Sequence, residues 1–403
     1  MDIRPILSAL LRNRTGAVLV ALQVAITLAV IANAFYIIER RLEKINHPTG
    51  VDSANLVFAQ SAGFAADFDP VATQIADLNL LRALPGVVAV TPISNIPLSD
   101  GGSANTYQTK PGEELNPAAG NIFEVDDQFI ATLGLRLVAG RNFRPAEYVL
   151  NPVNDTIPPQ MIITEDMAKQ LYGESPAVGQ RIYDNRGASA EVIGVVSNML
   201  GSWINNTKPK STELVFTASR PLATTLNRYA VRVRPGERDR LVPEIERRLG
   251  AIGHGRLITW VRPHDFFIKR IYRSDFRLVV FLSTLVFLMT VVTALGVVGL
   301  ATFHVNARRK QIGTRRALGA RRRDIIRYFL VENGLLAFGG SIVGGLLAYG
   351  ASGWLSRAFQ QPPLPLLYVL ATAIGILLLG QLAVLWPAYR AAAIDPAIAT
   401  RTV

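Results

Sequence analysis

The chain has 403 residues, of which 50% are hydrophobic and only 18% are charged, and its mean hydropathy is +0.27. Such sparse charge favours a protein that is partly embedded in a membrane over a soluble globular one. The net charge of +12 suggests either a nucleic-acid partner or an anionic membrane surface. The absence of Cys excludes disulfides, thiolate zinc sites and a cysteine nucleophile.

The N-terminal residues predict two helices. Residues 1–15 space Leu and Ile among Arg4, Arg12 and Arg14, which suits an amphipathic helix on the cytoplasmic membrane surface. Residues 16–38 are free of charge and long enough to form transmembrane helix 1. The basic start and Ala32-Asn33-Ala34 also resemble a cleaved secretory signal. Because the apolar run continues to Ile38, we expect the helix to be retained.

Residues 39–275 predict one folded α+β domain, because short β-branched runs alternate there with helical stretches and turn signals. We expect strands at 56–58, 86–90, 161–163, 191–196 and 229–233. We expect helices at 165–171, capped by Thr164, and at 242–249. Polar stretches with Pro and Gly at 99–117 and 145–159 indicate surface loops.

The rest of the chain predicts three further transmembrane helices, at 276–304, 328–356 and 364–389, joined by a cytoplasmic segment, 305–327, and followed by a cytoplasmic tail, 390–403. The fold class is therefore an α-helical membrane protein with four transmembrane helices plus an α+β extracytoplasmic domain.

The orientation follows from charge. Nine basic residues and one aspartate lie between Arg308 and Arg327, so most of the net charge sits in one loop between apolar runs. This pattern is typical of a cytoplasmic loop near membrane lipids and not of a nucleic-acid-binding face. Both termini are then cytoplasmic, and residues 39–275 lie outside.

Catalytic and metal-binding patterns are not found. The sequence has no phosphate-binding loop, no G-x-S-x-G elbow and no H-E-x-x-H motif, and its four His have no metal-ligand spacing. The adjacent carboxylates Asp126-Asp127 and Glu113-Glu114 are interpreted as solvated loop or cap residues. We therefore predict no catalytic residue and no metal site.

The basic segment at 305–327 also predicts secondary structure, beyond the charge that fixes its orientation. Gly319 can end one helix, and a second can begin near Ala320. A short helix with Arg321, Arg322 and Arg323 would suit an acidic groove on a cytoplasmic partner, while a loop that binds lipid headgroups is an equal alternative.

The third predicted transmembrane helix has two notable features. Gly340, Gly344 and Ala348 recur every four residues, which predicts close helix packing or dimerisation. Glu332 lies near the cytoplasmic end, where we expect it to snorkel or to pair with Arg327.

Several motifs together resemble the MacB/FtsX-type permeases of ABC transporters over nearly the full length of the chain. The most specific runs from Ala307 to Gly340, and the tail Pro387–Pro396 is similar to the C-terminal motif of the family with fewer basic residues. The segments similar to the periplasmic core domain of these permeases are 128–134, 139–141, 163–179 and 192–196.

The resemblance implies a permease in the bacterial inner membrane that works as a homo- or heterodimer with a second permease. ATP and Mg would bind to a separate ABC ATPase subunit, because no nucleotide-binding domain and only one four-helix unit are recognised here. It implies that the ATPase docks on Arg315, Arg316, Gly319, Ala320, Arg321, Arg322, Arg323 and Asp324.

Three functions follow from this resemblance and the domain layout. The first is export of a substrate driven by movement of the periplasmic domain, with a periplasmic adaptor and an outer-membrane channel as further partners. The second is an FtsX-like signalling scaffold that activates a periplasmic enzyme without transport. A plain receptor is a third hypothesis, which the lack of a readable pocket motif disfavours.

Overall fold

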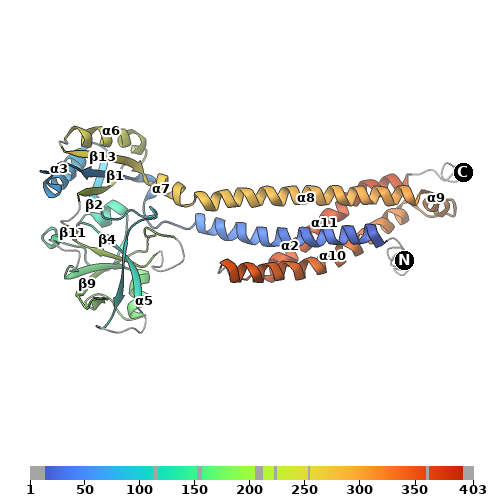
Figure 1. The fold of residues 1–403 in the computed structure, drawn as a ribbon, viewed down its shortest axis with the longest axis horizontal. Coiled ribbons are helices and arrows are strands. Elements are labelled where there is room, and N and C mark those ends of the chain that lie inside the picture. Colours follow the sequence, from blue (N-terminus) through green and yellow to red (C-terminus); the bar gives the residue numbers. More distant parts are fainter. Residues whose placement is uncertain are drawn as a thin grey trace. The chain divides into compact units, whose positions relative to one another are not determined.

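The computed structural model describes residues 14–111, 117–151, 157–204, 212–221, 225–252, 255–359 and 363–393. The chain divides into two compact units (Figure 1). The helical unit comprises Met1–Asn46 and Ser274–Val403, and the inserted domain comprises His47–Arg273. The amphipathic helix predicted at 1–15 falls almost entirely outside the described residues, as does most of the predicted tail.

The helical unit contains four helices that are long and apolar enough to cross a membrane. These are α2 (Arg14–Ile45), α8 (Arg273–Ala307), α10 (Arg322–Phe359) and α11 (Leu366–Ala392), with the short α9 (Arg309–Ala317) between α8 and α10. The predicted fold class is confirmed. Helix α2 continues seven residues past the predicted end at Ile38, because Glu39 to Ile45 remain helical after the apolar run stops.

Helix α10 packs closely against α2 through the small residues singled out in the sequence. A Cβ added at Gly340 would lie 2.7 Å from the carbonyl oxygen of Ala21, and one at Gly344 would lie 2.8 Å from that of Ala25. Ala348 is fully buried, and its carbonyl accepts a hydrogen bond from Asn33 Nδ2 at 3.1 Å. The small residues therefore let two helices of the same chain approach each other.

Helix α8 contacts α2 at a few polar points and through Leu300, which lies beside Gly16. Gln23 Nε2 donates to the carbonyl of Val292 at 3.0 Å, and the hydroxyls of Thr27 and Thr293 lie 2.8 Å apart. Asp275, near the start of α8, pairs with two cations at the end of α2, Arg41 at 2.7 Å and Lys44 at 3.3 Å. Only 6% of the apolar window of α8 is buried, against 50% for α2.

The inserted domain begins with a four-stranded antiparallel sheet. Its strands are β1 (Leu56–Gly63), β2 (Val87–Pro92), β12 (Leu226–Val233) and β13 (Arg256–Pro263), in the order β13-β1-β12-β2. Val57 and Ala59 of β1 face the core formed with helices α3 (Pro70–Ala83) and α6 (Arg238–Ala251), which lie together in Figure 1. Leu56 and Phe58 alternate to the other face.

A mixed seven-stranded sheet has the order β5-β9-β7-β10-β4-β3-β8, and β9 also pairs with β8, so that six strands close into a ring. Side chains at alternate positions of these strands point to opposite faces. One set fills the interior of the ring, and the other set packs in a core shared with the four-stranded sheet. The strands are β3 (Ser103–Gln108), β4 (Ala118–Glu124), β5 (Leu137–Gly140), β7 (Gln160–Thr164), β8 (Arg181–Asp184), β9 (Ser189–Val196) and β10 (Leu214–Thr217).

Shorter elements complete the inserted domain. The strands β6 (Val149–Asn151) and β11 (Ser219–Pro221) form a parallel pair. The remaining elements are the 3-10 helices η1 (Ser53–Asn55) and η2 (Pro145–Glu147), and the α-helices α4 (Phe129–Leu133), α5 (Glu165–Tyr172) and α7 (His264–Ile271).

The five predicted strands and two predicted helices of this domain are confirmed, with shifts at their ends. The predicted side-chain cap by Thr164 is wrong, because its hydroxyl donates to the carbonyl of Thr212 at 2.8 Å instead. The two predicted loops are wrong in part, because 99–117 contains β3 and 145–159 contains η2 and β6. Strand β3 has a polar sequence, Ser-Ala-Asn-Thr-Tyr-Gln, whose partners β4 and β8 hold it in the sheet. Tertiary pairing overrides local propensity there.

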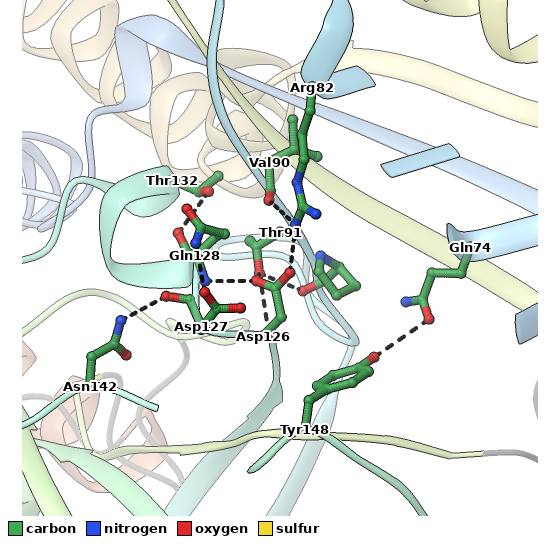
Figure 2. A network of polar contacts seen from close by, with 11 residues as sticks. Gln74, Arg82, Val90, Thr91, Asp126, Asp127, Gln128, Thr132, Asn142 and Tyr148 are labelled. Atoms are coloured by element: carbon green, nitrogen blue, oxygen red, sulfur yellow. Dashed lines mark hydrogen bonds and ion pairs between the residues drawn. The ribbon is translucent and has the colours of Figure 1, made fainter. Parts of the chain in front are cut away.

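The interpretation of Asp126 as a solvated residue is wrong. Its carboxylate is 7% exposed and accepts hydrogen bonds from Thr91 Oγ1 at 2.7 Å and from Arg82 Nη2 at 2.9 Å (Figure 2). It also accepts from the N–H of Gln128, the N-cap residue of α4, at 2.9 Å, so it holds the turn before the helix without being the cap itself. Burial raises the pKa of Asp126, and these hydrogen bonds oppose that rise. Glu113 and Glu114 lie outside the described residues.

Candidate partner-docking site

The junction between α8 and α9 is anchored to α10 by an ion pair. Arg308 Nη1 lies 3.1 Å from both carboxylate oxygens of Glu332 and donates to the hydroxyl of Tyr328 at 2.8 Å. Glu332 is 3% exposed, so its charge is largely compensated by this one guanidinium.

The predicted pairing of Glu332 with Arg327 is therefore wrong. Residues five apart on a helix do not share a face, and Arg327 is exposed. The end of α8 instead brings Arg308, which is 24 positions distant in sequence, to the carboxylate. This contact depends on the tertiary fold.

Helix α9 is seated on the ends of α10 and α11. Ile312 is buried in a cluster with Ile325 and Phe329 of α10 and Ala388 of α11. Arg316 Nη1 donates to the carbonyl of Ala392, the last residue of α11, at 3.0 Å. This contact satisfies a carbonyl that has no partner within its own helix.

A tight turn joins α9 to α10. The N–H of Gly319 donates to the carbonyl of Arg316 at 3.1 Å, and that of Ala320 donates to the carbonyl of Arg315 at 3.0 Å. This is the Schellman pattern, and it requires the positive φ of +99° found at Gly319. Asp324 Oδ2 then accepts from the N–H of Arg321 at 2.9 Å at the start of α10. A break at Gly319 agrees with the expectation from sequence.

The surface of this turn is strongly basic. Of the eight predicted docking residues, Arg316 and Ala320 are half-buried; the exposed ones are Arg315, Gly319, Arg321, Arg322, Arg323 and Asp324. Sequence reasoning missed Leu318, which is 83% exposed at the centre of the turn. Its position directly before the helix-ending Gly319 was the available signal. We call the surface formed by Arg315, Leu318, Arg321, Arg322 and Arg323 the basic turn.

The chemistry of the basic turn is that of recognition. Guanidinium groups bind carboxylates strongly, and an exposed leucine gains free energy when an apolar surface covers it. Within the described ranges, no group of three or more His, Asp or Glu side chains could hold a metal ion.

The arrangement of four apolar helices, an inserted α/β domain and a basic turn defines a polytopic membrane protein. Residues 283–396 match the FtsX-like permease C-terminal family, and residues 17–248 match the MacB-like periplasmic core domain. The second match covers more than half of the chain. The protein therefore belongs to the family of MacB/FtsX-like permeases of ABC transporters.

The curated relatives are named as export proteins that combine an ATP-binding part with a permease. The chain is 28% identical over 295 residues to the macrolide export ATP-binding/permease protein MacB of Chromobacterium violaceum, covering 68% of this chain and 42% of that protein. It is 27% identical to MacB of Bartonella quintana, covering 80% and 47%. For the probable syringafactin export protein SyfD of Pseudomonas syringae the identity is 29%, covering 59% and 36%. The chain thus spans less than half the length of each.

Two solved structures resemble part of the chain at low identity. The extracellular domain of the noncanonic ABC-type transporter YknZ from Gram-positive bacteria has a TM-score of 0.32 at 15% identity, covering 50% of this chain and 99% of that one. The periplasmic region of MacB from Actinobacillus actinomycetemcomitans has a TM-score of 0.33 at 15% identity, covering 57% and 97%.

Proposed function

We propose that this protein is the permease subunit of an ABC exporter and that a separate ATPase subunit docks on its basic turn. The observation that carries the proposal is the combination of exposed arginines and exposed Leu318 on a turn whose two helices are firmly anchored. An acidic groove with an apolar patch is the complementary surface. ATP and Mg bind to that ATPase, and the permease binds neither directly.

The anchoring supports transmission of movement from the ATPase. Contacts of Arg308, Ile312 and Arg316 hold α9 against α10 and α11. A displacement of the basic turn therefore moves these helices together with it. Helix α8 ends at this junction, and its other end follows α7 of the inserted domain after Tyr272 alone. We infer that nucleotide-driven movement travels along α8 to the inserted domain and drives export.

The orientation and the further partners belong to the same proposal. The basic turn and both termini lie in the cytoplasm of a bacterium, and the inserted domain lies on the outer side of the inner membrane. Helix α8 exposes large side chains, among them Phe281, Phe287 and Leu295. We infer that lipids and a second permease, of the same or another sequence, cover them. A periplasmic adaptor and an outer-membrane channel complete the exporter.

Charge reversal tests the docking surface. The triple variant Arg321→Glu, Arg322→Glu and Arg323→Glu should reduce the ATPase activity that co-purifies with the tagged permease from native membranes by at least about tenfold, since several charge-assisted contacts are lost. The control reverses Arg136, Arg181 and Arg234, three exposed arginines of the inserted domain, and should retain that activity. Equal ATPase recovery in both variants would contradict docking at the basic turn.

The match to the FtsX-like family favours a second candidate, a scaffold that activates a periplasmic enzyme. Export predicts that the purified complex, reconstituted in sealed vesicles with its ATPase, moves a compound across or out of the bilayer when ATP is supplied. ATP hydrolysis that stimulates a bound cell-wall hydrolase but moves no compound would favour the scaffold instead.

A further inference from the structure

The inserted domain contains a large pocket that the docking proposal does not use. It has a volume of about 650 Å³, within the range of small-molecule sites. Its walls come from β12, β13, α7 and the loop that precedes β3. We call it the arginine pocket, after Arg228, Arg262 and Arg270, which line it together with Trp260, Phe266 and Phe267.

The charge of the arginine pocket is positive without compensation. No residue in its lining is an Asp or a Glu. Among the described residues, no carboxylate lies within ion-pair distance of Arg228, Arg262 or Arg270. Three guanidinium groups around one cavity repel each other unless an anion enters.

The lack of a counter-charge matters most for Arg228, because it is the least exposed of the three arginines. Its Nε donates to Gln60 Oε1 at 2.7 Å, and its Nη1 donates to the carbonyl of Ser94, so all its partners are neutral. Burial lowers the pKa of Arg228, which means that the surroundings disfavour its charge. An anion in the pocket would supply the missing counter-charge.

An adjoining cavity of about 200 Å³, which shares Arg228 with the arginine pocket, continues this pattern. Arg220 lines it and is 4% exposed, and it donates to the neutral oxygens of Gln74, Asn227 and Pro70. Glu124 also lines it, and burial raises the pKa of this carboxyl to about 7. The one acid in the lining is therefore only partly ionised at neutral pH.

The aromatic side of the arginine pocket suits an apolar body. The ring centroids of Trp260 and Phe267 lie 5.4 Å apart in an edge-to-face arrangement, and Phe266 packs against Phe267 at the same distance. Phe266 is 40% exposed, and the guanidinium of Arg262 lies 5.4 Å from its ring centre. Aromatic area and cationic heads thus line the same cavity.

Backbone strain marks a loop that lines the arginine pocket. Leu98 and Asp100 have φ of +63°, a conformation that costs non-glycine residues free energy. Their N–H groups donate to the carbonyls of Gly201 and Ser202, at 2.9 Å each, which holds the loop in place. Ser99 and Gly101 of this loop line the pocket. Strained backbone held by its surroundings is typical of binding sites.

We propose that the arginine pocket binds an amphiphile with a carboxylate, sulfate or phosphate head and an aromatic or aliphatic body, and that this is the class of molecule the protein exports. The guanidinium groups hold the head, and Trp260, Phe266 and Phe267 cover the body. The assignment to cargo rests on the proposed function, whereas binding itself needs no ATPase.

The test measures binding to the full chain in nanodiscs of phosphatidylcholine. Trp203, Trp354 and Trp386 are replaced by Phe, so that Trp260 is the only tryptophan and serves as energy donor. The probe is 11-(dansylamino)undecanoic acid, and its methyl ester is the neutral counterpart. Saturable energy transfer to the acid, with at least about tenfold weaker transfer to the ester, is the expected result, because the ester lacks the charge.

Variants locate the binding. Arg262→Gln and Arg270→Gln should each raise the dissociation constant of the acid by about tenfold, and more in combination. Both residues are exposed, so the variants should unfold at the temperature of the parent protein. Arg136→Gln, an exposed arginine outside the pocket, should leave binding unchanged. Equal binding of acid and ester, or parental binding by the double variant, would overturn the proposal.

A further experiment distinguishes an exported amphiphile from an anionic lipid of the bilayer, because both have an anionic head and an apolar body. Replacing one third of the phosphatidylcholine by phosphatidylglycerol should not change transfer to the acid if the pocket takes a water-borne cargo. Loss of transfer would assign the pocket to an anionic lipid and overturn the assignment to cargo. Acid-selective binding together with normal ATPase docking but no export would contradict the proposed function and the assignment to cargo, and would leave anion binding by the arginine pocket standing.

Discussion

Helices α8 and α10 have similar lengths and opposite kinds of packing. Helix α10 meets α2 along a row of small residues, where Gly340 and Gly344 place backbone against backbone. Helix α8 contacts α2 through a few polar pairs such as Thr27 with Thr293 and through Leu300 beside Gly16, and its apolar window is 6% buried. Close packing fixes one position for α10, whereas a few hydrogen bonds can break and re-form one at a time.

The difference suggests a division of roles within one unit. We infer that α10 with α2 forms a frame and that α8 is the element that shifts along it, as the proposed function requires. The two ends of α8 are then the places that set its resting position, through Asp275 at one end and the adjacent Arg308 at the other. Variants in the contact between α10 and α2 and at the two ends of α8 test whether the two helices differ in this way.

The largest effect is expected at the frame. Gly340→Leu would force a side chain against the carbonyl of Ala21 and should destabilise the helical unit by about 3 kcal/mol, the upper end for an overpacked site, because the obstructing atom belongs to the backbone. Gly339→Leu is the matched control, since a Cβ there meets nothing within 4 Å. The measurement is the unfolding temperature in detergent micelles. Similar temperatures for the two variants would refute the close packing of α10.

An intermediate effect is expected at the anchor of α8. Glu332→Ala leaves the half-buried Arg308 without its counter-charge and should cost about 2 kcal/mol, below the full value for a buried pair because Arg308 retains some contact with water. The double variant Glu332→Ala with Arg308→Met should recover part of this loss in the same thermal assay. A double variant less stable than the single one would show that the ion pair is not the source.

The smallest effect is expected at the other end of α8. Asp275→Asn removes the charge that pairs with Arg41 and Lys44, and we expect a loss of about 1 kcal/mol or less, since both cations are partly exposed. The same change should increase the mobility of a spin label placed on this end of α8, while a label on α10 reports no change. An equal increase in label mobility on α8 and α10 would contradict the different roles inferred for these two helices.

Features set by local chemistry could be predicted from the sequence. Long apolar runs indicated the four long helices, because a bilayer imposes length and apolarity on each segment independently. The break at Gly319 was also predictable, since a positive φ at a helix end favours glycine. The spacing of Gly340, Gly344 and Ala348 indicated a close helix contact, although no pattern names the partner helix.

Features set by long-range pairing were missed. The contact of Glu332 with Arg308 needs the fold that returns α10 beside the end of α8. The arginine pocket needs β1 between β12 and β13, which brings Arg228 near Arg262 and Arg270. Asp126 is buried because helix α3 and strand β2 of the four-stranded sheet meet the end of β4 of the seven-stranded sheet.

The pairing of β8 with β9 has a consequence for how the inserted domain survives outside the cytoplasm. Strand β8 covers the first part of one side of β9, and β5 covers the last part of the same side. Within the described residues, ring closure thus leaves few strand sides free to recruit a strand from another molecule. Protection against edge-to-edge aggregation suits a domain that folds in a compartment without ATP-dependent chaperones.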